Sequence, residues 1–407
     1  MLEFLVLLAA LGGHVSIWVF LFNRVNGSGA PRRLVKLASL LGYGVVVATP
    51  PFAALALLGV WGDAGVAWAW AYAILCAGFG LGLLPKELIR RATARNTARC
   101  RVATGKIVDL AAGLPHRPTL GWTPRLLGEA PANDLCRVEF NEKELFPDRL
   151  PARLDGLRIL HLSDLHISGR LSRDYYERLL DQLEGREVDL AFVTGDILEK
   201  KECLSWAGET LRRVTARYGV HYILGNHDQR LKDVESLHRL LADLDWRRLG
   251  GRSCTVLVEG EEVLLCGDER PWFGPGPVPP EEQADATPRF RILLAHTPDR
   301  LAWARRHRFD LVFAGHTHGG QIRFPWIGPV ICPSIHGIEY ADGVFYESPT
   351  LMHVVRGAAS YFPIRFRCAH EATIVTLRSS ARAGSSSRLA AADVEGSHAA
   401  PCGVTPG

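Results

Sequence analysis

Three long apolar stretches at the start of the chain constrain its fold more than any other feature. Residues 4–22, 37–60 and 64–85 contain no Asp, Glu, Lys or Arg. About 20 helical residues cross the ~30 Å hydrocarbon core of a bilayer, and apolarity around the whole circumference of a helix favours lipid exposure over a soluble hairpin. A signal peptide is the alternative for the first stretch, but Glu3 replaces the usual basic start. We therefore expect residues 1–85 to form a membrane region with three transmembrane helices.

The basic residues that flank these stretches predict their orientation. The first loop holds Arg24, Arg32, Arg33 and Lys36, and residues 86–101 hold six further Lys and Arg. The intervening turn holds only Asp63. Because basic residues near span ends stay in the cytoplasm, both basic segments and everything C-terminal to them are expected on that side.

The charge and cysteine content exclude several classes of protein. Of the 407 residues, 47 are Lys or Arg and 43 are Asp or Glu, so the net charge of +4 is too small to indicate a nucleic-acid partner. The nine cysteines include no C-x-x-C pair, which argues against a zinc ribbon or a disulfide framework and favours a reducing compartment.

Beyond the apolar region the chain divides into three parts. We expect residues 86–132 to be a basic juxtamembrane linker that rests on anionic headgroups, or equally a merely solvated connector. Residues 133–377 alternate short apolar runs with amphipathic helical patterns, which predicts an α/β domain. The tail, residues 378–407, is rich in Ala, Ser and Gly and is expected to be disordered. The expected strands are Arg158–Leu162, Val188–Thr194, Val220–Leu224, Val263–Cys266, Arg291–Ala295 and Asp310–Ala314, and the expected helices are Asp174–Leu183, Leu204–Tyr218 and Leu231–Leu244.

Polar clusters follow five of these strands directly. In an open α/β sheet, residues beyond the carboxyl ends of the strands converge on one crevice, so the clusters should meet in space. Each cluster alone is weak, because a lone histidine near a strand end is more often a hydrogen-bonded structural residue than a ligand. Five together in one domain are hard to explain by accident. The clusters are Asp164-x-His166, Gly195-Asp196, Gly225-Asn226-His227-Asp228, His296 and Gly315-His316-x-His318.

The chemistry of the clusters predicts a metal centre. Two Asp, one Asn and four His exceed the four ligands that one zinc needs, so we expect two divalent ions that share a bridging carboxylate. Two such ions can lower the pKa of a shared water and hold the oxygens of an in-line displacement, as phosphate-ester hydrolysis requires. Carboxylate and imidazole ligands admit Mn, Fe, Zn or Mg.

The same motifs, in this order and spacing, resemble the full set of the calcineurin-like metallophosphoesterases over residues 157–320. The longer run from Gly315 to Ile322 resembles the bacterial membrane-anchored branch of the YkuE/YaeI type. The resemblance implies a four-layer αββα sandwich, a metal-dependent phosphoric ester hydrolase, and a multi-pass protein of the bacterial inner membrane whose catalytic domain faces the cytoplasm.

The resemblance also implies a role for each site residue. Asp164, His166 and His318 would hold the first metal, and Asn226, His296 and His316 the second, with Asp196 as the bridge. His227 would be the catalytic residue that faces the substrate and stabilises a phosphoryl oxygen or protonates the leaving group. Glu199 would orient it, with Asp228 as the second choice.

The substrate is less closely defined than the reaction. A membrane-tethered domain meets lipid-borne phosphates at high effective concentration, which favours a lipid-linked phosphodiester or pyrophosphate. The related branch suggests UDP-2,3-diacylglucosamine. The alternatives are a nucleic-acid or general phosphodiesterase and a non-catalytic membrane scaffold. Candidates for further phosphate contacts are Arg323, Arg356, Arg365 and Arg367, and Trp272 lies on a candidate lid, although solvated side chains and a plain surface loop are the simpler interpretations.

Overall fold

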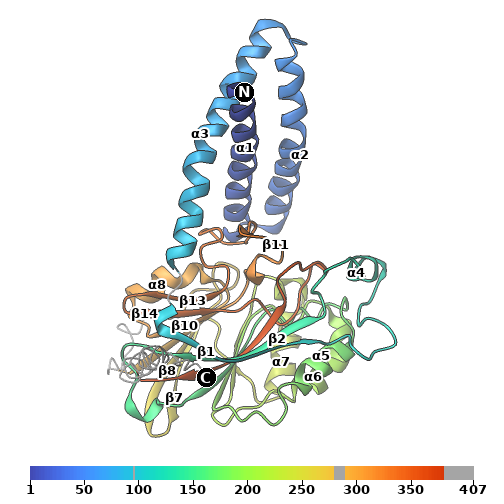
Figure 1. Cartoon of the computed structure of the whole chain (residues 1–407). Coiled ribbons are helices and arrows are strands. Elements are labelled where there is room, and N and C mark those ends of the chain that lie inside the picture. The colour runs from blue at the N-terminus through green and yellow to red at the C-terminus, as the bar shows by residue number, and fades with distance from the viewer. Residues whose placement is uncertain (95–96, 279–288, 380–407) are drawn as a thin grey trace, which may run out of the picture.

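The computed structural model describes residues 1–94, 97–278 and 289–379, so nearly all of the tail predicted to be disordered lies outside the described residues. Three long helices, α1 (Leu2–Gly27), α2 (Arg32–Leu57) and α3 (Gly62–Ala94), rise from one end of a domain of mixed sheets and shorter helices (Figure 1). Among the described residues, these helices are long and apolar enough to cross a membrane, as judged by length and composition.

The α1–α3 contact depends on small residues. A Cβ added at Gly13 of α1 would lie 1.7 Å from the carbonyl oxygen of Cys76 in α3, and one added at Gly80 would lie 2.7 Å from the Gly13 Cα. Small residues let the backbones of membrane helices approach closely, where dispersion and interhelical hydrogen bonds hold them together. One such bond joins His14 Nδ1 to the Tyr72 hydroxyl at 2.6 Å.

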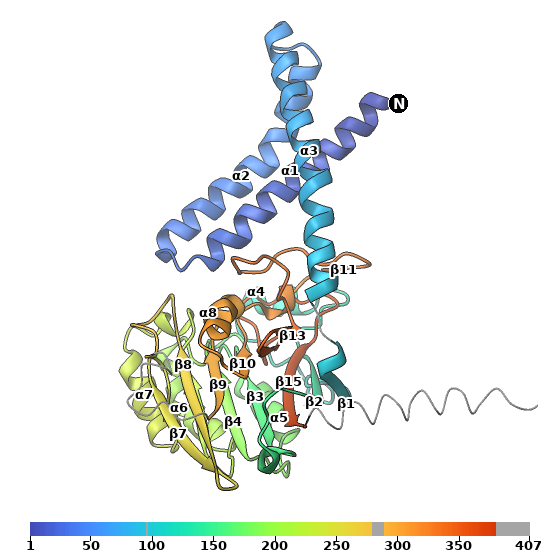
Figure 2. The same cartoon turned by 90° about the vertical axis from the view of Figure 1, so that its left-hand side faces the viewer.

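The described strands of the domain form two large sheets, seen below the helices in Figure 2. Within the described residues the first has seven strands, in the order β1 (Cys100–Asp109), β2 (Arg137–Leu145), β15 (His370–Leu377), β3 (Arg158–Leu162), β4 (Leu190–Thr194), β5 (Val220–Ile223) and β6 (Arg247–Arg248). The second has six in that part of the chain, in the order β13 (Gly343–Glu347), β14 (Thr350–Val354), β10 (Leu311–Ala314), β9 (Phe290–Ala295), β8 (Glu261–Asp268) and β7 (Ser253–Val258). β3, β4, β5 and β6 run parallel to one another, as do β8, β9, β10 and β14.

The core has three apolar layers. One lies between the two sheets, and one lies on the outer face of each sheet. Side chains from both sheets, such as Phe192 of β4 and Phe313 of β10, interlock between them. The outer face of the first sheet packs on α5 (Arg173–Asp181), α6 (Leu204–Leu211) and α7 (Val234–Ala242), and the outer face of the second packs on α8 (Leu301–Arg306). The predicted α/β sandwich with an N-terminal helical region is therefore confirmed.

Several boundaries differ from those expected. The segment 86–132, expected to be a linker, contains the tail of α3, α4 (Trp122–Gly128) and β1, and β1 pairs antiparallel with β2 at the edge of the first sheet. The exposed side chains of β1 gave no alternating apolar signal. The helix expected from Leu204 to Tyr218 ends at Leu211. The C-terminal strand β15 inserts between β2 and β3, a long-range pairing that local periodicity cannot predict.

Gly13→Ala tests the close crossing of α1 and α3. The added methyl group has no room, so the helices must separate, and overpacking of this kind costs about 1–3 kcal/mol. We expect a lower apparent melting temperature for the full chain in detergent micelles. Gly12→Ala is the matched control, because a Cβ there meets no atom within 4 Å. Equal melting temperatures for the two variants would contradict the crossing.

Candidate metal centre

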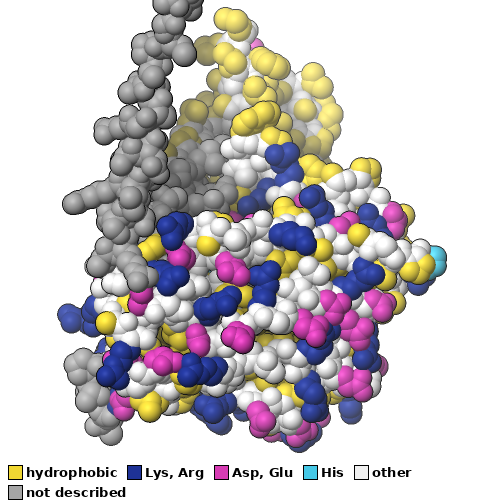
Figure 3. Space-filling model, turned by 60° about the horizontal axis from the view of Figure 1, so that its bottom comes forward, with side chains coloured by type: hydrophobic (Ala, Val, Ile, Leu, Met, Phe, Trp, Pro, Cys, Tyr) yellow, Lys and Arg dark blue, Asp and Glu magenta, His cyan; other side chains and the backbone are white. Residues whose placement is uncertain are grey.

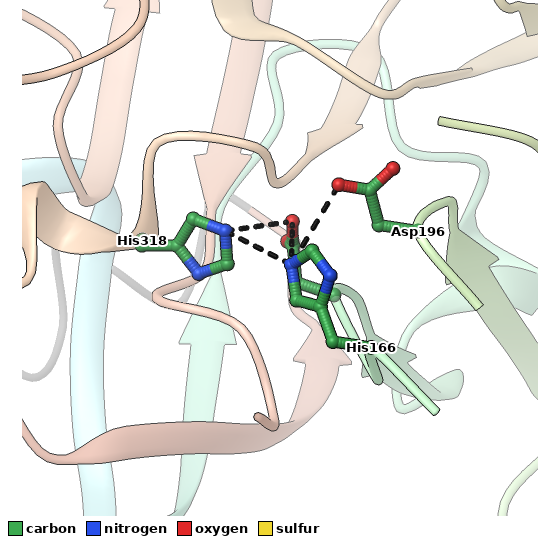
Figure 4. A group of neighbouring side chains, drawn as sticks. His166, Asp196 and His318 are labelled. Carbon is green, nitrogen blue, oxygen red and sulfur yellow. Dashed lines mark hydrogen bonds and ion pairs between the residues drawn. The ribbon is translucent and has the colours of Figure 1, made fainter. Parts of the chain in front are cut away.

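The first group of potential ligands joins three strand ends. Side-chain atoms of Asp164, His166, Asp196 and His318, all buried, lie within 4.8 Å of one another. Figure 4 labels His166, Asp196 and His318, which point toward one another. His166 Nε2 lies 3.1 Å from His318 Nε2 and 3.7 Å from Asp196 Oδ2, and His318 Nε2 lies 3.4 Å from Asp164 Oδ1. Residues that are far apart in sequence therefore present two imidazole nitrogens and two carboxylates to one point.

A second group shares Asp196 with the first. Atoms of Asp196, His296 and His316 also lie within 4.8 Å of one another. His296 Nε2 is 3.4 Å from Asp196 Oδ1, 3.2 Å from His316 Nδ1 and 3.1 Å from Asn226 Oδ1. The structure thus brings together all seven side chains that the sequence predicts as ligands, with Asp196 between the two groups.

Hydrogen bonds at Nδ1 orient three of the histidines. Glu199 Oε1 accepts from His166 Nδ1 at 2.7 Å and from His227 Nδ1 at 2.9 Å. The carbonyl of Thr194 accepts from His296 Nδ1 at 2.7 Å. An acceptor at Nδ1 turns the Nε2 of His166 and His296 toward the site, where each can bind a cation once Nε2 carries no proton.

Burial and neighbouring charges act in opposite directions on the titratable groups. Burial lowers the pKa of His316 to about 3. Burial also opposes the charged form of His296, but Asp196 outweighs it and raises the pKa of His296 to about 9. At Asp196 burial opposes ionisation, yet His296 and His227 hold the pKa of the carboxyl well below its usual range. The carboxylate is therefore charged, and His296 holds a proton that a cation must displace.

Three buried atoms in these groups lack any hydrogen-bond partner among the described residues. They are Asp164 Oδ1, Asp196 Oδ2 and His316 Nε2. An unsatisfied buried acceptor costs about 1–3 kcal/mol, and more when it is charged. Divalent cations of the Mn, Fe or Zn kind prefer this mixture of imidazole and carboxylate donors and would satisfy all three atoms. The residues present therefore fit a metal centre.

Five residues of the site have strained backbone conformations, which indicates a functional role for them. Asp164, His166, Asp196, His316 and His318 all have φ between 44° and 71°. Such left-handed conformations of non-glycine residues cost up to ~1–3 kcal/mol each and cluster at functional sites. Glycine allows a close approach nearby, since a Cβ at Gly225 would lie 2.3 Å from Asp196 Oδ1.

Asp228 has a different role from the one considered for it. Its two carboxylate oxygens accept hydrogen bonds from the backbone amides of Asp196, Ile197, Leu198 and Gly225, at 2.8–2.9 Å. Glu199 is the carboxylate that contacts His227 in this structure. Asp228 instead holds the turn that carries Asp196 in place.

Three further residues belong to the site. Arg230 forms an ion pair with Glu199, and its guanidinium lies 3.6 Å from the centroid of the Tyr361 ring. Trp272 packs against His316 and His296, with ring centroids 4.7 and 5.4 Å apart, so it is more than part of a plain surface loop. The fully buried Arg365 places Nη2 3.1 Å from His318 Nδ1. Nothing local in the sequence distinguishes these side chains from solvated ones.

Comparison with known proteins agrees with this geometry. Residues 157–320, which contain both ligand groups, match the family described as calcineurin-like phosphoesterase. The chain carries a calcineurin-like metallophosphoesterase domain. A domain of this family is a metal-dependent phosphoester hydrolase, as the sequence predicted.

The relatives of this metallophosphoesterase include membrane proteins. The chain is 27% identical over 247 residues to the metallophosphoesterase YkuE of Bacillus subtilis, which covers 60% of this chain and 86% of YkuE. It is 26% identical to the phosphodiesterase YaeI of Escherichia coli, over 54% of this chain and 82% of YaeI. A zebrafish transmembrane protein with a metallophosphoesterase domain is 29% identical over 58% of this chain, but the match spans only 56% of that protein.

Metal affinity should depend on pH, because His296 must lose its proton to bind a cation. With the pKa of His296 at about 9, we expect the Mn²⁺ affinity of the metal-free protein to rise about tenfold per pH unit between pH 6 and 8 and to level off above pH 9. Titration calorimetry in buffers of different ionisation enthalpy should count at least one proton released per chain at pH 7.5. An affinity independent of pH, with no proton released, would contradict the assignment.

Proposed function

We propose that this chain is a membrane-anchored, dinuclear-metal phosphoesterase that hydrolyses a phosphodiester or pyrophosphate bond of a lipid-linked substrate on the cytoplasmic side of the bacterial inner membrane. The observation that carries the proposal is that Asp196 belongs to both ligand groups. One carboxylate between two sets of nitrogen and oxygen donors suits a pair of cations better than a single one.

Each of the two ligand groups would hold one ion. Asp164, His166 and His318 would hold one, Asn226, His296 and His316 the other, and Asp196 would contact both. When bound, two divalent ions polarise phosphoryl oxygens and lower the pKa of nearby water. Their identity, among Mn, Fe, Zn and Mg, is left open by the donor types.

His227 is the chain's own candidate for proton transfer. It is half-buried, and its Nδ1 donates to Glu199. In the protonated ring the remaining Nε2–H can be given to a leaving oxygen, and the Glu199 carboxylate stabilises the imidazolium. Glu199 also orients His166, so one buried carboxylate couples the proton donor to the ligand set.

Several contacts support a site next to the membrane. The basic ends of α1 and α2 and the C-terminal end of α3 all adjoin the catalytic domain, and Arg90 of α3 forms an ion pair with Glu339. The turn between α2 and α3, with Asp63, lies at the far end (Figure 1). This distribution of charge supports the cytoplasmic side for the domain, and the relatives named as transmembrane proteins support membrane anchoring.

An exposed apolar loop at the base of the helices supports contact with lipid. The loop carries β11 (Arg323–Phe324) and β12 (Gly328–Pro329), and Figure 1 places it directly under α1–α3. Five apolar side chains in and directly after this loop are 43–103% exposed, and tryptophan is favoured at membrane interfaces. They are Phe324, Trp326, Ile327, Ile331 and Ile335.

A substrate carried in the bilayer follows from this placement. Tethering raises the effective concentration of lipid-borne phosphates at the site. UDP-2,3-diacylglucosamine, in which a pyrophosphate joins a diacylated sugar to a nucleoside, is the first substrate to try. A nucleic-acid phosphodiesterase is the second candidate, but on the face seen in Figure 3 Lys and Arg alternate with Asp and Glu rather than forming the basic stripe that DNA binding needs.

Asp196→Ala and His227→Ala should separate metal binding from turnover. Loss of the shared carboxylate should release metal and abolish nearly all hydrolysis of bis-p-nitrophenyl phosphate. Loss of His227 should leave the metal content unchanged and slow turnover by about 10²- to 10⁴-fold. Metal content is measured by mass spectrometry and activity by nitrophenolate release, with and without chelator.

Glu202→Ala provides the control, because this carboxylate is exposed and lies six residues beyond Asp196. It should behave as the wild type in both assays. An Asp196→Ala variant that keeps its metal and most of its activity would overturn the assignment of the site. Metal loss in His227→Ala would show that this histidine is a ligand.

A further inference from the structure

The end of α1 is fastened to the catalytic domain. Asn23, which is buried, donates from Nδ2 to the Val330 carbonyl at 3.2 Å and accepts from the Cys332 amide at 3.0 Å. A side-chain amide that pairs with both a carbonyl and an amide of a loop resembles one step of a β-ladder. One turn later, a Cβ at Gly27 would lie 2.6 Å from the backbone of Ser334 and Ile335.

The turn that follows, residues 28–31, reaches the loop over the metal centre. A Cβ at Gly29 would lie 2.2 Å from the Pro271 side chain, so the turn and this loop are in van der Waals contact. The next residue, Trp272, packs on the rings of His316 and His296. The α1–α2 turn is therefore separated from two potential metal ligands by one layer of side chains.

Arg32, the first residue of α2, directly follows this turn, and its charge acts on groups of the site. It is half-buried, whereas Arg33 and Lys36 are exposed. Its guanidinium interacts through charge with Arg230, Glu199, Tyr361 and Asp196, all of which belong to the metal centre or its surroundings. Within the described part of the chain, no hydrogen bond or ion pair occupies this guanidinium.

Arg230 provides a second cationic group, and its charge acts on that of Arg32. Its guanidinium stacks on Tyr361 and contacts Glu199, which already accepts from two histidines. Its Nε is buried and has no hydrogen-bond partner among the described residues. Two guanidinium groups that act on each other at one site repel, and an anion that bridges them removes this cost. Planar guanidinium groups recognise phosphate oxygens in bidentate fashion.

We propose that Arg32 and Arg230 together bind the phosphate of a bilayer lipid whose scissile bond lies at the metal centre, so that the membrane segment supplies a substrate-binding residue to the catalytic domain. The inference rests on the proposed function and specifies its substrate class. Arg32 begins a helix of membrane-spanning length, so a phosphate bound there lies at the level of the lipid headgroups. This height favours a lipid over a free phosphodiester.

A matched pair of probes tests the proposal. Phosphatidyl-p-nitrophenol in phosphatidylcholine nanodiscs and bis-p-nitrophenyl phosphate in solution release the same nitrophenolate, and hydrolysis of the lipid probe leaves phosphatidic acid. In the full-length enzyme, Arg32→Ala should lower kcat/KM for the lipid probe at least tenfold, mainly through KM. The ratio of lipid to soluble kcat/KM should fall by a similar factor, and the inhibition constant of dimyristoyl phosphatidic acid should rise.

Arg33→Ala is the control, because it removes an exposed arginine from the adjacent position. It should change neither probe by more than about twofold. Arg32→Lys should recover part of the lipid activity, because it keeps the charge but loses the bidentate geometry. Metal content and melting temperature of each variant show whether it is folded, and Arg32→Gln replaces Arg32→Ala if the alanine variant is not.

The outcomes separate the two levels of the proposal. If Arg32→Ala and Arg33→Ala both hydrolyse the lipid probe as fast as the wild type, Arg32 does not bind the lipid. The proposed phosphoesterase activity would not be affected by this result. An equal loss on both probes would show that Arg32 does not select a lipid, and activity on the soluble probe alone would exclude the lipid substrate. A wild type that is metal-loaded but inactive on both probes would contradict the proposed function itself.

Discussion

The buried carboxylate of Asp196 is the constraint on which the rest of the site depends. It is 1% exposed, and an isolated charge at such a depth is prohibitively costly unless cations or hydrogen-bond donors surround it. The His227 amide satisfies Oδ1 at 2.7 Å, but Oδ2 has no hydrogen-bond partner among the described residues. The protonated His296, and the cations that the surrounding histidines would hold, compensate the remaining charge.

This requirement explains the architecture around the carboxylate. Both carboxylate oxygens of Asp228 accept hydrogen bonds from backbone amides and so hold the turn that carries Asp196. Five ligand residues have left-handed backbone conformations, which direct their side chains toward the site. The glycines beside them remove Cβ atoms that would collide with the ligands. The two packed sheets supply the stability that maintains this strain, since the strands that carry the site are buried on both faces.

The sequence predicted the site more fully than its surroundings, for physical reasons. Ligands such as His296 follow short apolar runs directly, so a local pattern and the rule that strand ends converge were enough to bring them together. The edge strand β1 was not predicted because its exposed side chains show no alternation of apolar and polar residues. The strand β15 was not predicted because its partner strands lie more than 200 residues away in sequence. The roles of Arg365 and Trp272 depend on long-range packing against His318 and His316, which no local spacing encodes.

We propose that the three N-terminal helices and the catalytic domain act as a single functional unit, with the candidate metal centre next to the turn that joins the first two helices. The central claim is that seven side chains surround two cations with Asp196 between them. Anomalous diffraction from crystals of the Mn²⁺-loaded protein tests it most directly. We expect two peaks per chain, one beside His166 and His318 and one beside His296 and His316, both in contact with Asp196. A single peak, or peaks away from Asp196, would contradict it.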